Sequence, residues 1–76
     1  MSKAGARHFI KIAVSMVETG ESEGDVLLTL IEAASEAVNA RRKAATQHIL
    51  TAMHDAFTGT DEDIIDSLAR AERALR

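Results

Sequence analysis

Cysteine, proline, tryptophan and tyrosine are all absent from this sequence, and phenylalanine occurs only twice. The absence of cysteine excludes disulfide bonds and thiolate metal sites, and it fits a reducing compartment. The scarcity of aromatic rings leaves little that could stack on nucleic-acid bases. The longest apolar runs are only a few residues, too short for a membrane span or a signal peptide. We therefore expect a soluble, cytoplasmic protein that does not bind membranes.

The residues that are present favour helices. The chain has 76 residues, which allows one domain with a modest core. Its apolar residues are mainly aliphatic, with three methionines and fourteen alanines, a composition typical of helical proteins. The net charge of -3 is mild and does not by itself indicate nucleic acid or a membrane surface as a partner. The sequence predicts a single all-α domain over residues 1–76.

The stretch 25–57 dominates the pattern, because it contains neither glycine nor proline and keeps apolar side chains in helical phase. This stripe consists of Leu27, Ile31, Ala34, Val38, Ala45, Ile49, Met53 and Phe57, with Arg42 as its one charged member. The pattern predicts one long central helix between two short helical arms, at about 6–18 and 60–75. No internal repeat is evident.

Local signals mark the ends of these helices. Gly20 and Gly59 are placed to end the first arm and the long helix. Ser22 or Asp25 can cap the start of the long helix, and Thr60 can cap the last arm, whose first turn is rich in carboxylates. Both connections are short, so each arm is expected to pack antiparallel to one half of the long helix.

A second apolar line on the long helix predicts self-association. It consists of Leu30, Ala33, Ala37, Ala40 and Ala44, and it lies about 100° around the helix from the first stripe. One face would take the arms, and the alanine-rich face would be the dimer interface, since small side chains let helices approach closely. We therefore predict a homodimeric helix bundle with two-fold symmetry. The alternative is a compact monomeric four-helix bundle in which the long helix breaks near Asn39.

Folding in this way would bring basic residues together at the middle of the long helix. The predicted partner-binding residues of this basic waist are Lys3, Arg7, Arg41, Arg42, Lys43, Arg70 and Arg73. Most carboxylates would lie at the two tips. A positive waist indicates a docking surface for an acidic protein, although the charges also suit an ordinary solvated surface. Nucleic acid is a less favoured partner because the chain is acidic overall and poor in aromatic residues.

Catalytic and metal-binding patterns are missing. The histidines His8, His48 and His54 form no HxxxH pair. Glu21, Glu23, Asp25 and Glu32 follow the spacing of a calcium-binding loop, but Val26 stands where that loop needs glycine. No catalytic residue, metal site or cofactor is predicted.

The predicted function is therefore non-catalytic. We expect a small regulatory or inhibitory adaptor that acts by protein–protein interaction as a helical homodimer. The alternatives are a nucleic-acid-associated protein that uses the basic waist and a structural assembly subunit.

Overall fold

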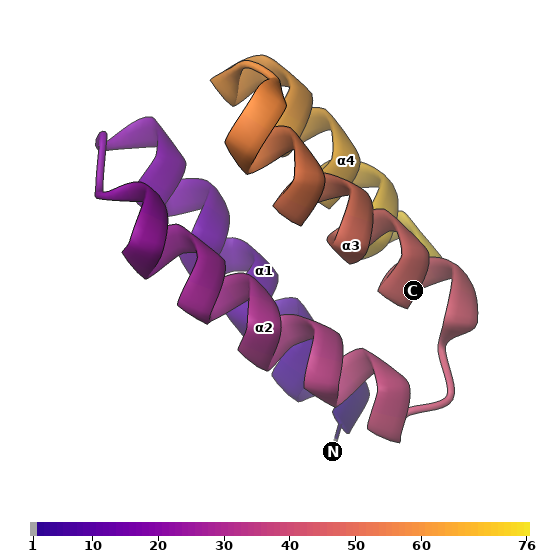
Figure 1. The fold of residues 1–76 in the computed structure, drawn as a ribbon. Helices are drawn as coiled ribbons and strands as arrows, with labels where there is room; N and C mark the ends of the chain where they lie inside the picture. Colours follow the sequence, from indigo (N-terminus) through magenta and orange to yellow (C-terminus); the bar gives the residue numbers. More distant parts are fainter. Residues whose placement is uncertain (1) are drawn as a thin grey trace.

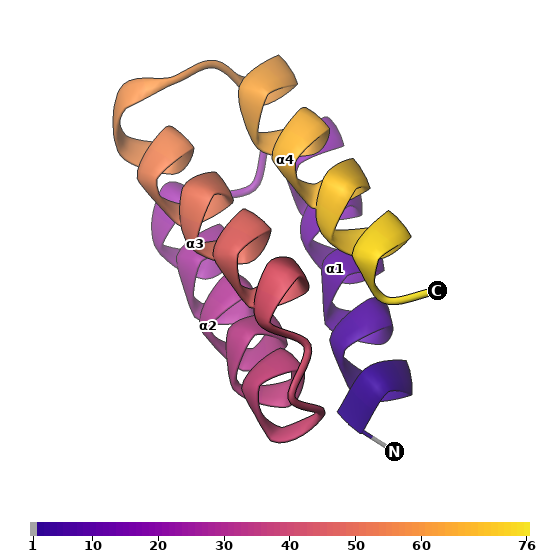
Figure 2. The ribbon, with the colours of Figure 1, turned by 90° about the vertical axis from the view of Figure 1, so that its right-hand side faces the viewer.

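Four helices of similar length alternate in direction in the computed structural model, which describes residues 2–76 (Figure 1). They are α1 (Ser2–Glu18), α2 (Glu23–Asn39), α3 (Lys43–Thr58) and α4 (Asp61–Ala74). The hairpins α1–α2 and α3–α4 pack face to face, with α2 beside α3 and α1 beside α4 (Figures 1 and 2). The bundle measures 29 × 16 × 16 Å. This is an all-α, up-down-up-down four-helix bundle, and none of the four helices is both long and apolar enough to cross a membrane.

The prediction of one unbroken helix over 25–57 is wrong, because the chain reverses between α2 and α3. The backbone N–H groups of Arg41 and Arg42 donate to the carbonyls of Val38 and Ala37, each over 2.9 Å. Arg41 has a φ of 57°, in the left-handed region. These bonds form a Schellman C-cap, which usually has glycine at the left-handed position. The four-helix alternative, with its break near Asn39, describes the arrangement of helices within this chain.

The other helix ends follow their sequence signals. Gly20 ends α1 with a φ of 76°, and Ser22 accepts a hydrogen bond from the backbone N–H of Asp25 at the start of α2. Thr60 and Asp63 form a reciprocal capping box at the start of α4. Gly59 ends α3 in an extended conformation and not in a left-handed one. These caps confirm the predicted starts at Ser22 and Thr60.

The core lies along the bundle axis and is built largely from alanine. Buried positions recur at steps of four, three and four residues: Ala6, Ile10, Ala13 and Val17; Val26, Leu30, Ala33 and Ala37; Ala45, Ile49 and Ala52, with the half-buried Ala56; and Ile64, Leu68, Ala71 and Leu75. Small residues at so many core positions let the four helices pack closely.

This core corrects the predicted dimer interface. Leu30, Ala33 and Ala37 are fully buried by the chain's own helices, while Ala40 is half-buried and Ala44 is exposed. The line that was expected to contact a second copy therefore belongs mainly to the core of one chain. The stripe that was expected to lie under the arms is partly exposed instead, at Ile31 and Val38.

The two hairpins are an internal repeat that the sequence pattern did not reveal. Matching their buried positions pairs identical residues, at Ala6 and Ala45, Ile10 and Ile49, Ala13 and Ala52, Gly20 and Gly59, Leu30 and Leu68, and Ala33 and Ala71. One residue separates Gly20 from the cap Ser22 in the first hairpin, whereas Gly59 and the cap Thr60 are adjacent in the second. The sequence offset between matching residues therefore changes within the hairpin, and a comparison at one fixed spacing misses the repeat.

Side-chain contacts between the helices of each hairpin also match. Thr29 donates to the sulfur of Met16 over 3.3 Å in the first hairpin, and the matching Ser67 donates to Oδ2 of Asp55 over 3.0 Å in the second. An approximate two-fold rotation about the long axis therefore relates α1 to α3 and α2 to α4.

Candidate functional site

One end of the bundle gathers nearly all the positive charge. The start of α1, the α2–α3 turn and the last turns of α4 meet there (Figure 2). We call this the basic end, and its residues are Lys3, Arg7, Arg41, Arg42, Lys43, Arg70, Arg73 and Arg76. The chain has nine lysines and arginines, and only Lys11 lies elsewhere. The structure thus brings together all seven predicted partner-binding residues, but at an end and not at a waist, because the long helix is broken.

Two of these cations are already paired. Glu72 of α4 contacts Arg7 of α1 over 3.1 Å and Arg76, one helical turn away, over 2.8 Å. The hydrogen bond from Arg76 holds the pKa of the Glu72 carboxyl below its ordinary value, and the charges of Arg76 and Arg7 act in the same direction. Arg7 is consequently a link between α1 and α4, and its Nε is buried with no hydrogen-bond partner in the part of the chain described.

The other cations of the basic end are open to a partner. Within residues 2–76, no carboxylate forms an ion pair with Lys3, Arg41, Arg42, Lys43, Arg70 or Arg73. All of them are exposed except Lys3, which is half-buried. Arg42 precedes α3 and makes no side-chain cap, so it is a surface residue of the turn. Besides Glu72, Glu36 lies at this end, where its carboxylate covers Gly5 of α1.

The opposite end carries the negative charge. The α1–α2 and α3–α4 turns meet there (Figure 1). We call this the acidic end, and its residues are Glu18, Glu21, Glu23, Asp25, Asp55, Asp61, Glu62, Asp63 and Asp66. Glu21, Glu23 and Asp61 line a shallow depression between the two turns. The described residues contain no group of histidines and carboxylates that could hold a metal ion. Charge separation along the bundle is therefore the main electrostatic feature of the molecule.

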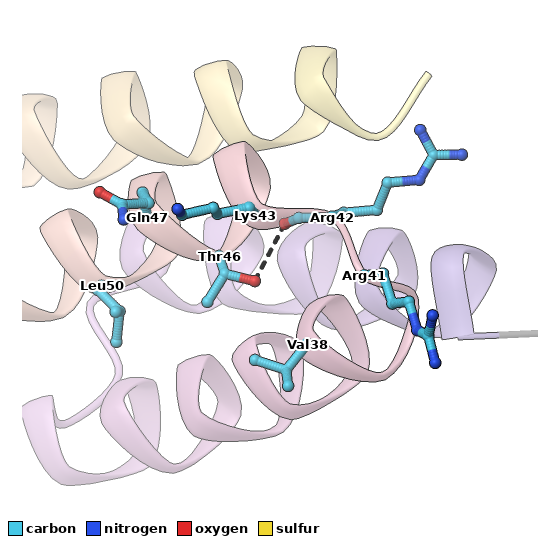
Figure 3. Close-up of a pocket in the computed structure, with 7 residues that line it drawn as sticks. All are labelled: Val38, Arg41, Arg42, Lys43, Thr46, Gln47 and Leu50. Atoms are coloured by element: carbon cyan, nitrogen blue, oxygen red, sulfur yellow. Dashed lines mark hydrogen bonds between the residues drawn. The ribbon is translucent and has the colours of Figure 1, made fainter.

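A groove between α2 and α3 is the second candidate surface, and sequence reasoning missed it. We call it the α2–α3 groove, and it is lined by Ile31, Ala34, Ser35, Val38, Asn39, Thr46, Leu50 and Met53 around a hollow of about 570 Å³. Val38 of α2 and Leu50 of α3 both lie in the gap between these two helices, as Figure 3 shows. The apolar stripe over residues 25–57 is the sequence signal for this groove. In a chain that continued straight through Arg41, the helical arms would cover the stripe, so the sequence predicts a core position for it.

The α2–α3 groove runs directly into the basic end. A hollow of about 330 Å³ shares Val38, Thr46 and Leu50 with it and is otherwise lined by Arg41, Arg42, Lys43 and Gln47 (Figure 3). The Thr46 hydroxyl donates to the carbonyl of Arg42 over 3.0 Å and fixes the first turn of α3. An apolar channel with three cations at its mouth suits a protein surface better than a small polar substrate.

The hydrogen bonds of the described residues do not pair a histidine with a carboxylate. The carboxylate of Asp55, seven residues after His48, accepts its hydrogen bond from Ser67. Within residues 2–76, the hydrogen-bond partner of the His54 ring is the hydroxyl of Thr58, one helical turn away, at 3.3 Å. Comparison of the chain with protein-family models, with curated proteins and with solved structures gives no match in any of the three. Any functional assignment therefore depends on the two surfaces described above.

Proposed function

We propose that this chain is a non-catalytic regulatory or inhibitory protein of the cytoplasm, which works as a homodimer and binds an acidic surface of another protein through its basic end. The observation that supports this most is the concentration of cations from three separate segments at one end of the bundle. Six of them lack an ion pair within residues 2–76. Such a surface attracts an acidic partner and speeds its association.

An acidic protein fits this surface better than nucleic acid. The bundle is about 16 Å across by its Cα atoms, before side chains are added. It is therefore too blunt to enter a DNA major groove, which is about 12 Å wide. The acidic end would also repel a long phosphate backbone, whereas a protein partner can contact the basic end alone. Binding to the outside of a duplex remains the second candidate because it needs only the same cations.

Apolar exposure supports the homodimer. Ile31, Val38, Leu50 and Phe57 are between 48% and 67% exposed, and all four lie on α2 and α3. Contiguous apolar surface of this kind marks interaction sites in soluble proteins. The dimer would use this side of the bundle and leave Lys3, Arg70 and Arg73, which belong to α1 and α4, for a different partner.

Selection from a random peptide display library tests the basic end directly, because the library samples acidic, neutral and basic sequences alike. The bait proteins are the wild type, the Lys3→Glu/Arg70→Glu/Arg73→Glu variant and Lys11→Glu. Lys11→Glu is the matched control, because it reverses the one cation outside the basic end. We expect wild type and Lys11→Glu to enrich the same acidic peptides. The triple variant should lose them, since reversal turns attraction into repulsion.

The same three proteins are then titrated with the enriched peptides and with a random DNA duplex at about 50 mM and about 200 mM salt, because phosphate binding weakens steeply over this range. Tighter binding to the duplex, lost in the triple variant, would favour the nucleic-acid function. Enrichment of neutral or basic peptides, or equal binding by the triple variant, would contradict the proposed partner class.

A further inference from the structure

The internal repeat supplies a direct comparison for the α2–α3 groove. The approximate two-fold rotation places this groove in correspondence with the groove between α1 and α4. That second groove is lined by Ile10, Lys11, Val14, Ser15, Glu18, Ile65, Leu68, Ala69 and Glu72. The two grooves occupy equivalent places on the same scaffold, so differences between their side chains do not arise from the fold. Those differences indicate what each groove contacts.

Charged residues in one groove correspond to uncharged residues in the other. Arg7, Lys11 and Glu18 of α1 match Thr46, Leu50 and Phe57 of α3, while Glu72 of α4 and Arg76, just after α4, match Ala34 and Val38 of α2. Ion pairs of Glu72 with Arg7 and Arg76 close one end of the α1–α4 groove, and Lys11 and Glu18 of the same groove are exposed to water. Its counterpart has lost every charge at these positions. Depletion of charge with enrichment of aliphatic and aromatic residues is typical of the buried part of a protein interface.

Most positions that border the α2–α3 groove carry neither a carboxylate nor a lysine or arginine side chain. The neighbouring outward positions on the two helices are Leu28, Ser35, Asn39, Gln47 and His54. Leu28 is 64% exposed and extends the apolar surface along α2. By contrast, Ile12 is the one large exposed apolar residue outside α2 and α3 among residues 2–76, and it is only 36% exposed. The α2–α3 side of the bundle therefore exposes apolar side chains along most of its length.

We propose that this side binds the same side of a second copy, with the two bundles antiparallel. The inference depends on the homodimer of the proposed function and assigns its interface and orientation. The two-fold axis would cross the middle of the α2–α3 groove at right angles to the bundle. Apolar residues from two copies would then cover one another in an isologous contact.

Charge at the two ends of this side selects the occupant. Arg41, Arg42 and Lys43 close the groove at the basic end, while Glu21, just before α2, and Glu23, in its first turn, lie at the other end. In an antiparallel pair the cations of each copy face these carboxylates of its partner. In a parallel pair the cations would face their own copies, and like charges across an interface are unfavourable. One surface thus carries both the apolar contact and the complementary charges, as a self-complementary interface must.

The available surface is adequate for a stable dimer. A standard interface buries about 800 Å² on each partner. The whole chain exposes 4551 Å², and the α2–α3 side is one of four long sides of an elongated bundle. One side of this molecule therefore meets the usual requirement without involving the ends or the α1–α4 groove.

Sedimentation equilibrium of the full chain tests the interface. Measurements from about 1 μM to about 100 μM are needed, since a dimer's population depends on protomer concentration. We expect wild type to have twice the monomer mass of 8.2 kDa. Ile31→Glu/Leu50→Glu should raise the dimer dissociation constant by about a hundredfold or more, because it places charges in the apolar contact. Ile12→Glu is the matched control and should leave the mass unchanged, while circular dichroism checks that all three proteins are folded.

Charge exchange tests the orientation. Arg42→Glu/Lys43→Glu and Glu21→Lys/Glu23→Lys should each weaken the dimer, since each places like charges at both ends of an antiparallel contact. Combining the four substitutions in one chain should restore the wild-type dissociation constant. A parallel dimer predicts no weakening by the first pair and no rescue by the combination, so that result would overturn the proposed orientation.

The remaining outcomes separate this inference from the proposed function. If the Ile31→Glu/Leu50→Glu variant still dimerises, the homodimer of the proposed function stands, but the α2–α3 interface is wrong. A wild type that is monomeric throughout would overturn both, while the peptide selection still reports on the basic end. A mass beyond the dimer would contradict a closed two-fold contact and would favour the structural assembly subunit.

Discussion

Arg41 decides how many helices the molecule has. Its φ of 57° lets the chain turn at the end of α2 while the backbone N–H groups of Arg41 and Arg42 still donate hydrogen bonds to carbonyls of α2. A β-carbon in the left-handed region costs about 1–2 kcal/mol, which glycine avoids. This cost is offset because the turn lets the two hairpins bury their alanine and leucine positions against each other. The backbone at one residue is strained so that the whole core can form.

Replacing Arg41 by glycine should stabilise the fold. Glycine removes the steric cost at positive φ, and part of the gain is lost because glycine is more flexible in the unfolded chain. We expect the free energy of unfolding to rise by about 0.5–1 kcal/mol in urea denaturation. Arg42→Gly is the control, since Arg42 has a φ of -99° and glycine should destabilise the fold there. Equal effects of the two substitutions would show that the strain at Arg41 is unimportant.

The hydrogen bond between Ser67 and Asp55 is the second residue-scale feature. Ser67 is only 3% exposed and donates over 3.0 Å to a half-buried carboxylate. Asp55→Ala should therefore cost about 1–2 kcal/mol, because it leaves the buried hydroxyl without this partner. Adding Ser67→Ala should restore part of the loss, since an apolar pair needs no hydrogen bond. Thermal unfolding of wild type, Asp55→Ala, Ser67→Ala and the double variant gives the coupling energy between the two residues. Strictly additive losses of stability would contradict a stabilising hydrogen bond between them.

At the scale of elements, Glu72 ties α4 to α1. Its carboxylate contacts Arg7 across the helix interface and Arg76 just after the end of α4. These contacts hold the pKa of Glu72 below its ordinary value in the folded chain. The proton thus binds more weakly to the folded chain than to the unfolded one. The resulting stabilisation is present above the pKa of the unfolded chain and disappears as the pH falls through the folded pKa.

Comparing wild type with Glu72→Gln at several pH values tests this link. Wild type should be the more stable protein at pH 7, and the difference should shrink as the pH falls through the folded pKa of Glu72, which lies below its ordinary value. The difference between the two proteins is used because many other carboxylates titrate over the same range. Urea unfolding at each pH provides the measurement. A difference that does not change with pH would mean that the charge of Glu72 has no role in joining the helices.

Also at the scale of elements, the two hairpins show what a duplicated scaffold permits. Most equivalent core positions keep the same alanine, isoleucine or leucine, because both hairpins must pack closely. Equivalent outer positions are free to differ, and one groove is charged while the other is apolar. The contrast between Lys11 and Leu50 shows this most simply, as both occupy the same place on matching helices.

At the scale of the whole molecule, side-chain charges are separated along the bundle axis. Alternating helix directions largely cancel the helix dipoles, so the separation comes from the placement of Arg, Lys, Asp and Glu. In the proposed dimer, Lys3, Arg70 and Arg73 of the basic end remain available to an acidic partner, while the α2–α3 side contacts a second copy. An antiparallel dimer would carry one basic end at each of its own ends, which would let a single dimer bind two partner molecules.

Much of the fold follows from the sequence alone. Composition and periodicity indicate an all-α domain, and Gly20, Ser22 and Thr60 mark helix ends where the structure has them. Local chemistry is sufficient there, because caps and left-handed turns depend on the residues that form them. Clustering of the basic residues also followed, since antiparallel neighbours bring the start of α1, the α2–α3 turn and the end of α4 together in either fold.

The tertiary structure decided where the chain turns and which apolar line is buried. The turn at Arg41 has no local signal, because its strain is offset only by packing far away in the sequence. Once the chain turns there, Leu30, Ala33 and Ala37 face the core, and Ile31 and Val38 face outward. A rotation of about 100° separates these lines on α2, and both satisfy helical periodicity equally well. Only the packing of four helices around one axis distinguishes core from groove, so the candidate interface became visible in three dimensions.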